Sequence, residues 1–372
     1  MQIKGFCDDK FSDVRKLFQS YFDKKIETGA SFALVKDGKI LVSIFGGYLN
    51  NNLNEWLENT LVNTFSLSKG IYAACISKLI SENLLDIEKP VAYYWKSFKQ
   101  DNKKNILVRH LLSHQSGMYR FKTKLNNEDL LDWEKIIYIL ENQEPDHKPE
   151  EFTYYHAKTH GYLVGNLIKI ITGLSLGKYL RENITNKYNL KFSFGLNNLE
   201  INDVANLVGD PKDETKSINQ DLNAFNNPQH DLNFYNTKNW RKSEVPSMGG
   251  HGNAYSIAYI YDCLANDIKQ NTTKISNCLT LKTGLIETNS KIDLSLHFPI
   301  KWTKLGFILR GGWMFGLNKE SFGHNGWGGS LGFADPILGL GISYITKKIN
   351  PTMGADKRAV NLIKKFYEIY SS

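Results

Sequence analysis

Residues 64–70 (Thr-Phe-Ser-Leu-Ser-Lys-Gly) place a hydroxyl and an amine at a spacing that suits acyl-transfer chemistry. Ser66 and Lys69 are three residues apart, so on a helix that opens here their side chains share one face of the first turn. An amine in that place can take the hydroxyl proton while the oxygen attacks a carbonyl carbon. A helix N-terminus and a dry pocket both disfavour the charged ammonium, which makes Lys69 a usable base. The pattern predicts Ser66 as the nucleophile.

The Ser-x-x-Lys pattern is weak evidence alone, because it occurs again at Ser175 and Lys178. There we expect a surface helix on which the serine is a cap and the lysine is solvated. A tyrosine strengthens the interpretation of the first copy, Ser66 and Lys69, as a catalytic pair. Tyr155, in the stretch Tyr-Tyr-His-Ala at 154–157, precedes a predicted helix. Its phenol can relay a proton between Ser66 and the leaving group, and a nearby lysine favours the phenolate form. We therefore predict Tyr155 as a second base.

A glycine-rich stretch at 322–336 (Phe-Gly-His-Asn-Gly-Trp-Gly-Gly-Ser-Leu-Gly-Phe-Ala-Asp-Pro) is the third feature with chemical potential. Glycines beside a strand let the backbone come close to a ligand. We expect His324 in this stretch to hold the substrate or its polar end.

The elements that must position these residues follow from periodicity. Residues 11–27 have helical spacing, and two β-rich runs flank Asp37-Gly38, a strong hairpin signal. Residues 199–250 are rich in Asn and Asp and are predicted as mostly loop, with aromatic residues that line or cover a cleft. Further helices are expected at 66–85, 107–112, 133–140, 158–182, 255–265 and 356–370, and short strands at 304–309, 313–317, 330–334 and 339–346.

This order predicts an α/β (α+β) architecture in which a largely antiparallel sheet is flanked by helices. We expect residues 1–80 and 295–372 to form one sheet lobe from both chain ends. Residues 81–294 would form a mostly helical second lobe, with the cleft between the two and 199–250 as its loop-rich cover.

The order Ser-x-x-Lys, Tyr, His-x-Gly resembles the serine β-lactamase-like superfamily, specifically the class C–related esterases of the family VIII carboxylesterase type. Residues 56–70, 155–161 and 323–329 are similar to that family, and so is Leu-Leu-Ser-His-Gln-Ser-Gly at 111–117. The resemblance implies a β-lactamase/transpeptidase-like fold and a serine hydrolase that is acylated on Ser66, with Lys69 and Tyr155 as its base network. It also implies an oxyanion hole made by the backbone N–H groups of Ser66 and Gly328. The substrate contacts that it implies are His156, His324, Asn325, Gly326 and Trp327.

Two departures from the family pattern favour an ester over a β-lactam. Where β-lactamases of this class have Tyr-x-Asn and Lys-Thr-Gly, this chain has Ala157 and His324. The asparagine for the side-chain amide and the fixed cation for the carboxylate are both missing. A histidine that need not be charged at neutral pH suits a neutral acyl ester better. The expected substrate is a small acyl ester.

The same cleft is compatible with three alternative functions. An acyltransferase shares every catalytic residue and differs only in whether an alcohol or water accepts the acyl group. A β-lactamase or D-amino-acid peptidase is a second alternative. A non-enzymatic binding protein is a third, although such a cleft has no need of Ser66, Lys69 and Tyr155 together.

Two further motifs are decoys. Gly-Gly-Ser-Leu-Gly around Ser330 fits the nucleophile elbow of α/β-hydrolases, but no histidine follows residue 324 to complete that triad. Lys-Thr-Gly at 282–284 is followed by neither a glycine-rich turn nor long strands.

Composition excludes several classes of partner. The net charge is +8 and the pI about 9.0, yet the basic residues are scattered and no nucleic-acid-binding motif occurs, so no nucleic acid is expected. No apolar stretch resembles a signal peptide or membrane span, which predicts a cytoplasmic protein without membrane contact. His156 and His160 are four residues apart but lack a third ligand, so we expect neither a metal nor an organic cofactor.

Overall fold

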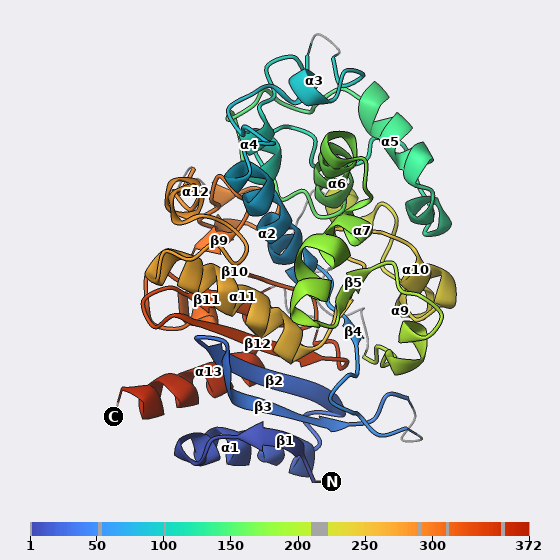
Figure 1. Ribbon diagram of the computed structural model, residues 1–372. Coiled ribbons are helices and arrows are strands. Elements are labelled where there is room, and N and C mark those ends of the chain that lie inside the picture. Colours follow the sequence, from blue (N-terminus) through green and yellow to red (C-terminus); the bar gives the residue numbers. More distant parts are fainter. Residues whose placement is uncertain are drawn as a thin grey trace.

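A computed structural model describes residues 2–50, 54–99, 102–209, 222–288, 292–309, 312–350 and 354–371. Its main sheet has seven strands in the order β1-β3-β2-β12-β11-β10-β9, with every neighbouring pair antiparallel (Figure 1). These strands are β1 (Lys4–Cys7), β2 (Gly29–Lys36), β3 (Lys39–Gly47), β9 (Ile308–Leu309), β10 (Phe322–Asn325), β11 (Leu331–Asp335) and β12 (Leu340–Thr346). The β2–β12 pairing joins strands from opposite ends of the chain.

The hairpin predicted at Asp37-Gly38 is confirmed. Lys36 pairs with Lys39, so the turn has two central residues. Asp37 has φ 52° and Gly38 has φ 77°. Two left-handed residues give a turn whose twist matches the flanking strands, and Asp-Gly is a favoured sequence for it.

Helices cover both faces of this sheet. On one face lie α1 (Ser12–Asp23) and α13 (Lys357–Tyr370), the two terminal helices, drawn in blue and red in Figure 1. Their buried residues Phe18 and Phe366 join Phe32 and Ile342 of the strands in one apolar cluster. On the other face lie α2 (Leu67–Ser81) and α11 (Ala254–Lys269). α11 falls within the 81–294 range, yet it packs on β2, β11 and β12.

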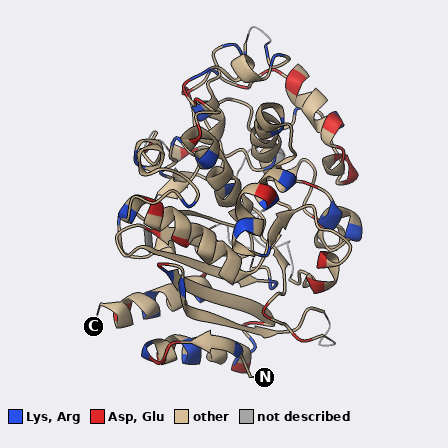
Figure 2. Cartoon of the chain, in the orientation of Figure 1, with Lys and Arg blue, Asp and Glu red and all other residues tan. Residues whose placement is uncertain are grey.

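Further helices lie around α2, and those between Val91 and Asn142 are toward the top of Figure 1. Gly173, at φ 72°, ends the helix Thr159–Thr172 in the left-handed conformation. These elements are α3 (Val91–Tyr94), α4 (Val108–Leu112), α5 (Trp133–Asn142), α6 (Thr159–Thr172), α7 (Leu176–Leu180) and α12 (Cys278–Gly284). Figure 2 shows acidic and basic residues interspersed over these helices. Within the described ranges, none of the helices is both long and apolar enough for a membrane span.

Two smaller sheets bear on the site. β4 (Val62–Asn63), β6 (Gly250–Gly252) and β5 (Phe192–Phe194) form the first, with β6 in the centre. β4 leads directly into the start of α2. The second is a hairpin of β7 (Ile292–Asp293) and β8 (Phe298–Pro299), and the β8 residues line the cavity described below.

The structure differs from the sequence prediction in two segments. Residues 312–315 form a 3-10 helix instead of the strand predicted at 313–317. A continuous apolar run has no alternation, so its periodicity cannot separate strand from helix. Residues 199–250 contain, between their loops, helical pieces that the sequence did not predict: a 3-10 helix (Glu200–Asp203) and the short helices α8 (Leu222–Asn226), α9 (Leu232–Tyr235) and α10 (Lys238–Lys242). Residues 210–221 of that segment lie outside the described residues.

Candidate active site

Ser66 stands at a sharp turn between β4 and α2. Phe65, just before it, has φ 46°, a left-handed conformation that bulky residues rarely adopt. The turn is held because Thr64 donates both its backbone N–H, at 2.8 Å, and its hydroxyl, at 3.0 Å, to the Gly250 carbonyl of β6. Ser66 itself lines a cavity. Local strain of this kind is typical of functional sites.

Lys69 is fully buried one turn into α2. Its Nζ lies 3.1 Å from Ser66 Oγ, 3.0 Å from the Ala157 carbonyl and 3.2 Å from the Ser247 carbonyl. Burial lowers the pKa of Lys69 well below the value of a free lysine. A neutral amine has two N–H groups, which the two carbonyls accept, and one lone pair. That lone pair then faces the Ser66 hydroxyl and can receive its proton.

Tyr155 covers this pair from the other side. Its ring centroid is 4.8 Å from Lys69 Nζ, and the ring stacks on Trp302 at 5.6 Å and 7°. Burial raises the pKa of Tyr155, Asp293 raises it further, and a hydrogen bond with Ser66 only partly offsets both. The phenolate predicted from the sequence is therefore wrong as the resting form. Desolvation outweighs the nearby lysine, which is itself neutral, and Tyr155 is a phenol.

Asp293 positions the tyrosine and was not identified from the sequence. Its Oδ1 accepts the backbone N–H of Tyr155 at 3.1 Å, and its Oδ2 accepts the indole N–H of Trp302 at 3.1 Å. It also accepts from the backbone of Ser295 and Leu296. The side chain is buried, which raises its pKa to about 6. One carboxylate thus holds both stacked rings and the β7–β8 hairpin, but it lies in a segment without any recognisable motif.

His324, at the end of β10, lines the cavity as predicted. Its Nδ1 lies 2.7 Å from the Asn325 carbonyl, so this nitrogen carries the proton. Nε2 is then an acceptor, and it is buried without a partner in the described structure. Burial, reinforced by Lys69, lowers the pKa of His324 to about 3. The imidazole is neutral at physiological pH, as the sequence suggested, and offers a substrate a lone pair rather than a charge.

The backbone after β10 approaches the start of α2 at Gly326. A Cβ at this position would lie 2.1 Å from the Thr64 carbonyl, so only glycine fits. Asn325 and Trp327 line the cavity, and the Trp327 ring meets Phe65 edge to face at 5.1 Å. Gly328, the predicted second oxyanion donor, is not among the lining residues. Its carbonyl accepts from Asn350 and Arg358, both at 3.1 Å.

His156 is placed differently from the prediction. It is fully buried and does not line the cavity. Its Nδ1 donates to the Tyr154 carbonyl at 2.7 Å, and its Nε2 lies 2.7 Å from Ser116 Oγ. Both ring nitrogens are thus occupied, which leaves none for a substrate. The residue after it, Ala157, does line the cavity.

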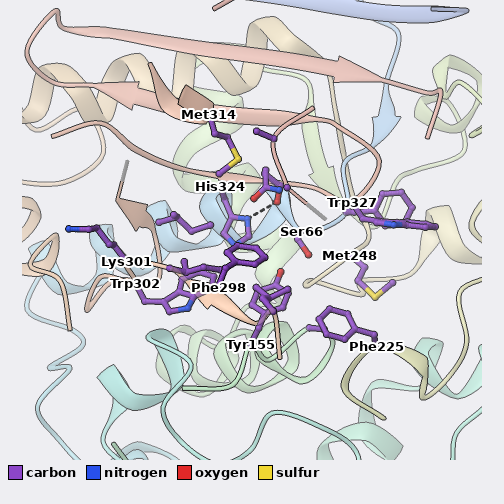
Figure 3. A pocket seen from close by; sticks show the side chains of 18 of the residues that line it. Ser66, Tyr155, Phe225, Met248, Phe298, Lys301, Trp302, Met314, His324 and Trp327 are labelled. Atoms are coloured by element: carbon purple, nitrogen blue, oxygen red, sulfur yellow. Dashed lines mark hydrogen bonds between the residues drawn. The ribbon is translucent and has the colours of Figure 1, made fainter. Parts of the chain in front are cut away.

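The cavity has a volume of about 360 Å³. Figure 3 shows Ser66 between two groups of side chains, with Phe298, Trp302 and Met314 on one side and Phe225, Met248 and Trp327 on the other. Most of the remaining wall is also apolar, from Leu296, Ile300, Ile308 and Leu309. An apolar pocket with a few convergent polar groups is typical of a small-molecule site.

The three other motifs with possible catalytic residues, at Ser175, Lys282 and Ser330, do not line the cavity. Ser175 caps α7 by accepting the Lys178 backbone N–H, and Lys178 faces solvent. Lys282 to Gly284 form the last residues of the helix α12 rather than a strand. Ser330 is buried beside β12, where it accepts the Thr346 N–H.

Comparison with known proteins agrees with this geometry. The model of the Beta-lactamase family matches residues 14–365. The crystal structure of a family VIII carboxylesterase superposes with a TM-score of 0.93 at 32% identity, over 99% of this chain and 100% of the other. A penicillin-binding protein homologue from Caulobacter crescentus gives 0.90 at 29% identity, over 99% and 100%.

Among sequence relatives, the esterase/beta-lactamase LipL of Mycobacterium tuberculosis is 25% identical over 366 residues, which cover 94% of this chain and 83% of that protein. The match to the family model spans nearly the whole chain and includes Ser66, Lys69, Tyr155 and His324. The chain therefore belongs to the beta-lactamase family and is a serine hydrolase of the β-lactamase/transpeptidase-like fold.

Proposed function

We propose that the protein hydrolyses small acyl esters through an acyl-enzyme on Ser66. The observation that carries this is the environment of Lys69, whose Nζ lies 3.0 and 3.2 Å from two carbonyl oxygens and 3.1 Å from Ser66 Oγ, so that a neutral amine can direct its lone pair at the hydroxyl. As Oγ attacks the ester carbonyl, its proton passes to Lys69. Water then attacks the acyl-enzyme, with Lys69 as the base again.

Tyr155 is suited to deliver a proton to the leaving alcohol. It is a phenol, it is hydrogen-bonded to Ser66, and its ring lies over the Lys69 amine. When Lys69 gains the serine proton, the new ammonium stabilises negative charge on the phenol oxygen. Tyr155 can therefore give its proton to the departing alkoxide and then take the proton that Lys69 gained from Ser66, which restores the neutral amine for hydrolysis of the acyl-enzyme.

For the oxyanion hole we propose the backbone N–H of Ser66 and a second N–H from the turn after β10. Trp327 fits the second position better than Gly328, the residue predicted from the sequence. Gly326 brings this turn against the Thr64 carbonyl, and Trp327 is the next residue and faces the cavity. Donors fixed in advance stabilise the charge that develops only in the transition state.

An ester fits this cavity better than the substrates of the alternative hydrolases. Neutral His324 and Ala157 offer neither a cation nor an amide partner to a β-lactam. None of the described lining residues is acidic, so nothing there would pair with the ammonium of a D-amino-acid group. The relatives named above as esterases support the same choice. A cytoplasmic location remains a prediction from the sequence.

Covalent labelling tests the proposal. A fluorophosphonate probe should add once to the wild-type protein, as measured by intact mass spectrometry, and the adduct should disappear in Ser66→Ala. Ser330→Ala is the matched control, because Ser330 is the decoy nucleophile and is buried in the sheet. Labelling that persisted in Ser66→Ala and vanished in Ser330→Ala would overturn the assignment.

A further inference from the structure

A second buried lysine lines the cavity and has no part in the chemistry described above. Lys158 follows Ala157, the residue whose carbonyl accepts from Lys69. Its side chain is only 3% exposed and forms part of the cavity wall. Its Nζ donates to the Pro228 carbonyl, on the segment just before α9. Lys158 is therefore fixed in place at the site rather than extended into solvent.

This lysine has no acidic partner within the described structure. None of the described lining residues is Asp or Glu, and burial is the sole cause of its altered pKa, which falls to about 7. The other lysine of the cavity wall, Lys301, is exposed and pairs with Glu287 at 3.1 Å. Buried charges in proteins are almost always paired, so an unpaired amine in a ligand cavity lacks its counter-ion.

The position of Lys158 relative to Ser66 follows from its neighbours. Its hydrogen-bond partner Pro228 is two residues from His230, whose ring stacks on Trp327 at 4.7 Å. These contacts place Lys158 on the side of the cavity that Phe225 and Trp327 line, and Figure 3 labels these two aromatic residues. The opposite side carries Phe298, Trp302 and Met314 together with neutral His324 and the exposed Lys301 (Figure 3). An ester bound at Ser66 extends its acyl and alcohol parts in different directions, so one part reaches each side.

We propose that Lys158 forms an anion subsite, so that the preferred substrates are esters carrying a carboxylate on the part that faces Trp327. This rests on the proposed function. The Pro228 carbonyl takes one N–H of the ammonium, and two remain for the carboxylate. The bound carboxylate is the missing counter-ion and stabilises the protonated form of the Lys158 amine. The rest of the substrate contacts the mainly apolar wall of the cavity.

Matched substrates test the subsite. The neutral reference is p-nitrophenyl butyrate. Mono-p-nitrophenyl glutarate adds a carboxylate on the acyl part, and 4-carboxyphenyl butyrate adds one on the alcohol part. In Lys158→Met, kcat/KM should fall about 10- to 100-fold for at least one carboxylate ester, mainly through KM, because a charge-assisted hydrogen bond is lost. The neutral ester should lose far less. Lys301→Met should change the ratio of charged to neutral rates by less than about twofold, because exposed pairs contribute little.

The pH dependence gives a second readout. The ratio of kcat/KM for the charged and the neutral ester cancels the titration of Lys69, which both substrates share. In the wild type this ratio should fall as the pH rises through about 7, where Lys158 loses its proton. In Lys158→Arg it should stay constant, because arginine remains charged. His230→Gln shows whether the neighbouring imidazole contributes to the same titration.

Two results would overturn the subsite. One is an equal loss for neutral and charged esters in Lys158→Met, which would make Lys158 a structural tie to Pro228. The other is a wild-type ratio that does not change with pH and is unaffected by Lys158→Met. A protein that cleaves none of the three esters would instead overturn the proposed function. In that case calorimetric titration with glutarate still tests Lys158, since binding should weaken at least tenfold in Lys158→Met.

Discussion

The chain contains the Ser-x-x-Lys spacing twice, and the two copies have opposite environments. At Ser66 the lysine is fully buried, three oxygens surround its Nζ, and the serine faces a cavity. At Ser175 the serine oxygen accepts a helix N–H, and Lys178 lies in solvent, 3.8 Å from Glu182. The spacing is the same, so it cannot by itself make a nucleophile. What differs is desolvation of the amine, which removes its charge.

Exchanging Lys69 for alanine gives the largest expected effect. Lys69→Ala removes the base and should lower the turnover of p-nitrophenyl butyrate by about two to four orders of magnitude, the usual range for positioned proton transfer. Lys178→Ala is the matched control at the second copy and should keep wild-type turnover, because its lysine is solvated. Equal losses in the two variants would mean that burial does not distinguish the two copies.

The tyrosine pair sharpens the comparison, because only the first copy has a phenol beside it. Tyr155→Phe should lower turnover by about two to three orders of magnitude and leave the melting temperature nearly unchanged, since the stack on Trp302 is kept. Tyr154, which stacks on Tyr119 at 4.4 Å, is the neighbouring control, and Tyr154→Phe should have a much smaller effect. A large loss in Tyr154→Phe together with normal activity in Tyr155→Phe would transfer the role to Tyr154.

Substrate preference gives a smaller effect. Without a cation at His324 or an amide partner at Ala157, the enzyme should cleave p-nitrophenyl butyrate about two orders of magnitude faster than nitrocefin, in kcat/KM. His324→Lys should reduce this preference, because a fixed cation restores a carboxylate anchor on the Trp302 side. If purified wild-type enzyme cleaved both substrates equally well, a β-lactamase or peptidase would replace the esterase.

Local signals explain what was predictable from the sequence. The 11–27 periodicity gave α1, the Asp37-Gly38 turn gave the β2–β3 hairpin, and the helices α2, α5, α6, α11 and α13 fell within or close to their predicted ranges. In each case the residues that form the pattern are close together in the sequence, so the pattern does not depend on tertiary contacts. The family and its fold were also predictable, because the motifs around Ser66, Tyr155 and His324 occur in a specific order.

The parts that sequence reasoning missed depend on packing between distant segments. Asp293 lies 138 residues from Tyr155, and no motif links the two. Lys158 is at the start of a helix, where a lysine is usually solvated, but here it is buried and bonds to Pro228, 70 residues later in the chain. The prediction that His156 contacts the substrate failed for the same reason: Ser116, 40 residues earlier in the chain, lies within hydrogen-bond distance of its Nε2. The protonation of Tyr155 also depends on burial, which a sequence neighbour cannot reveal.

The central claim is that Lys69 is a neutral base in the resting enzyme, and the pH dependence of Ser66 labelling tests it most directly. The rate of fluorophosphonate addition can be followed by intact mass spectrometry on the wild type across a pH series. Lys69 must lose its proton to accept one from Ser66, so the rate should rise with pH and then reach a plateau. With the pKa of Lys69 lowered by burial, the account predicts a midpoint well below the pKa of a free lysine. A midpoint at the free-lysine value would contradict it, since the amine would then be charged at neutral pH.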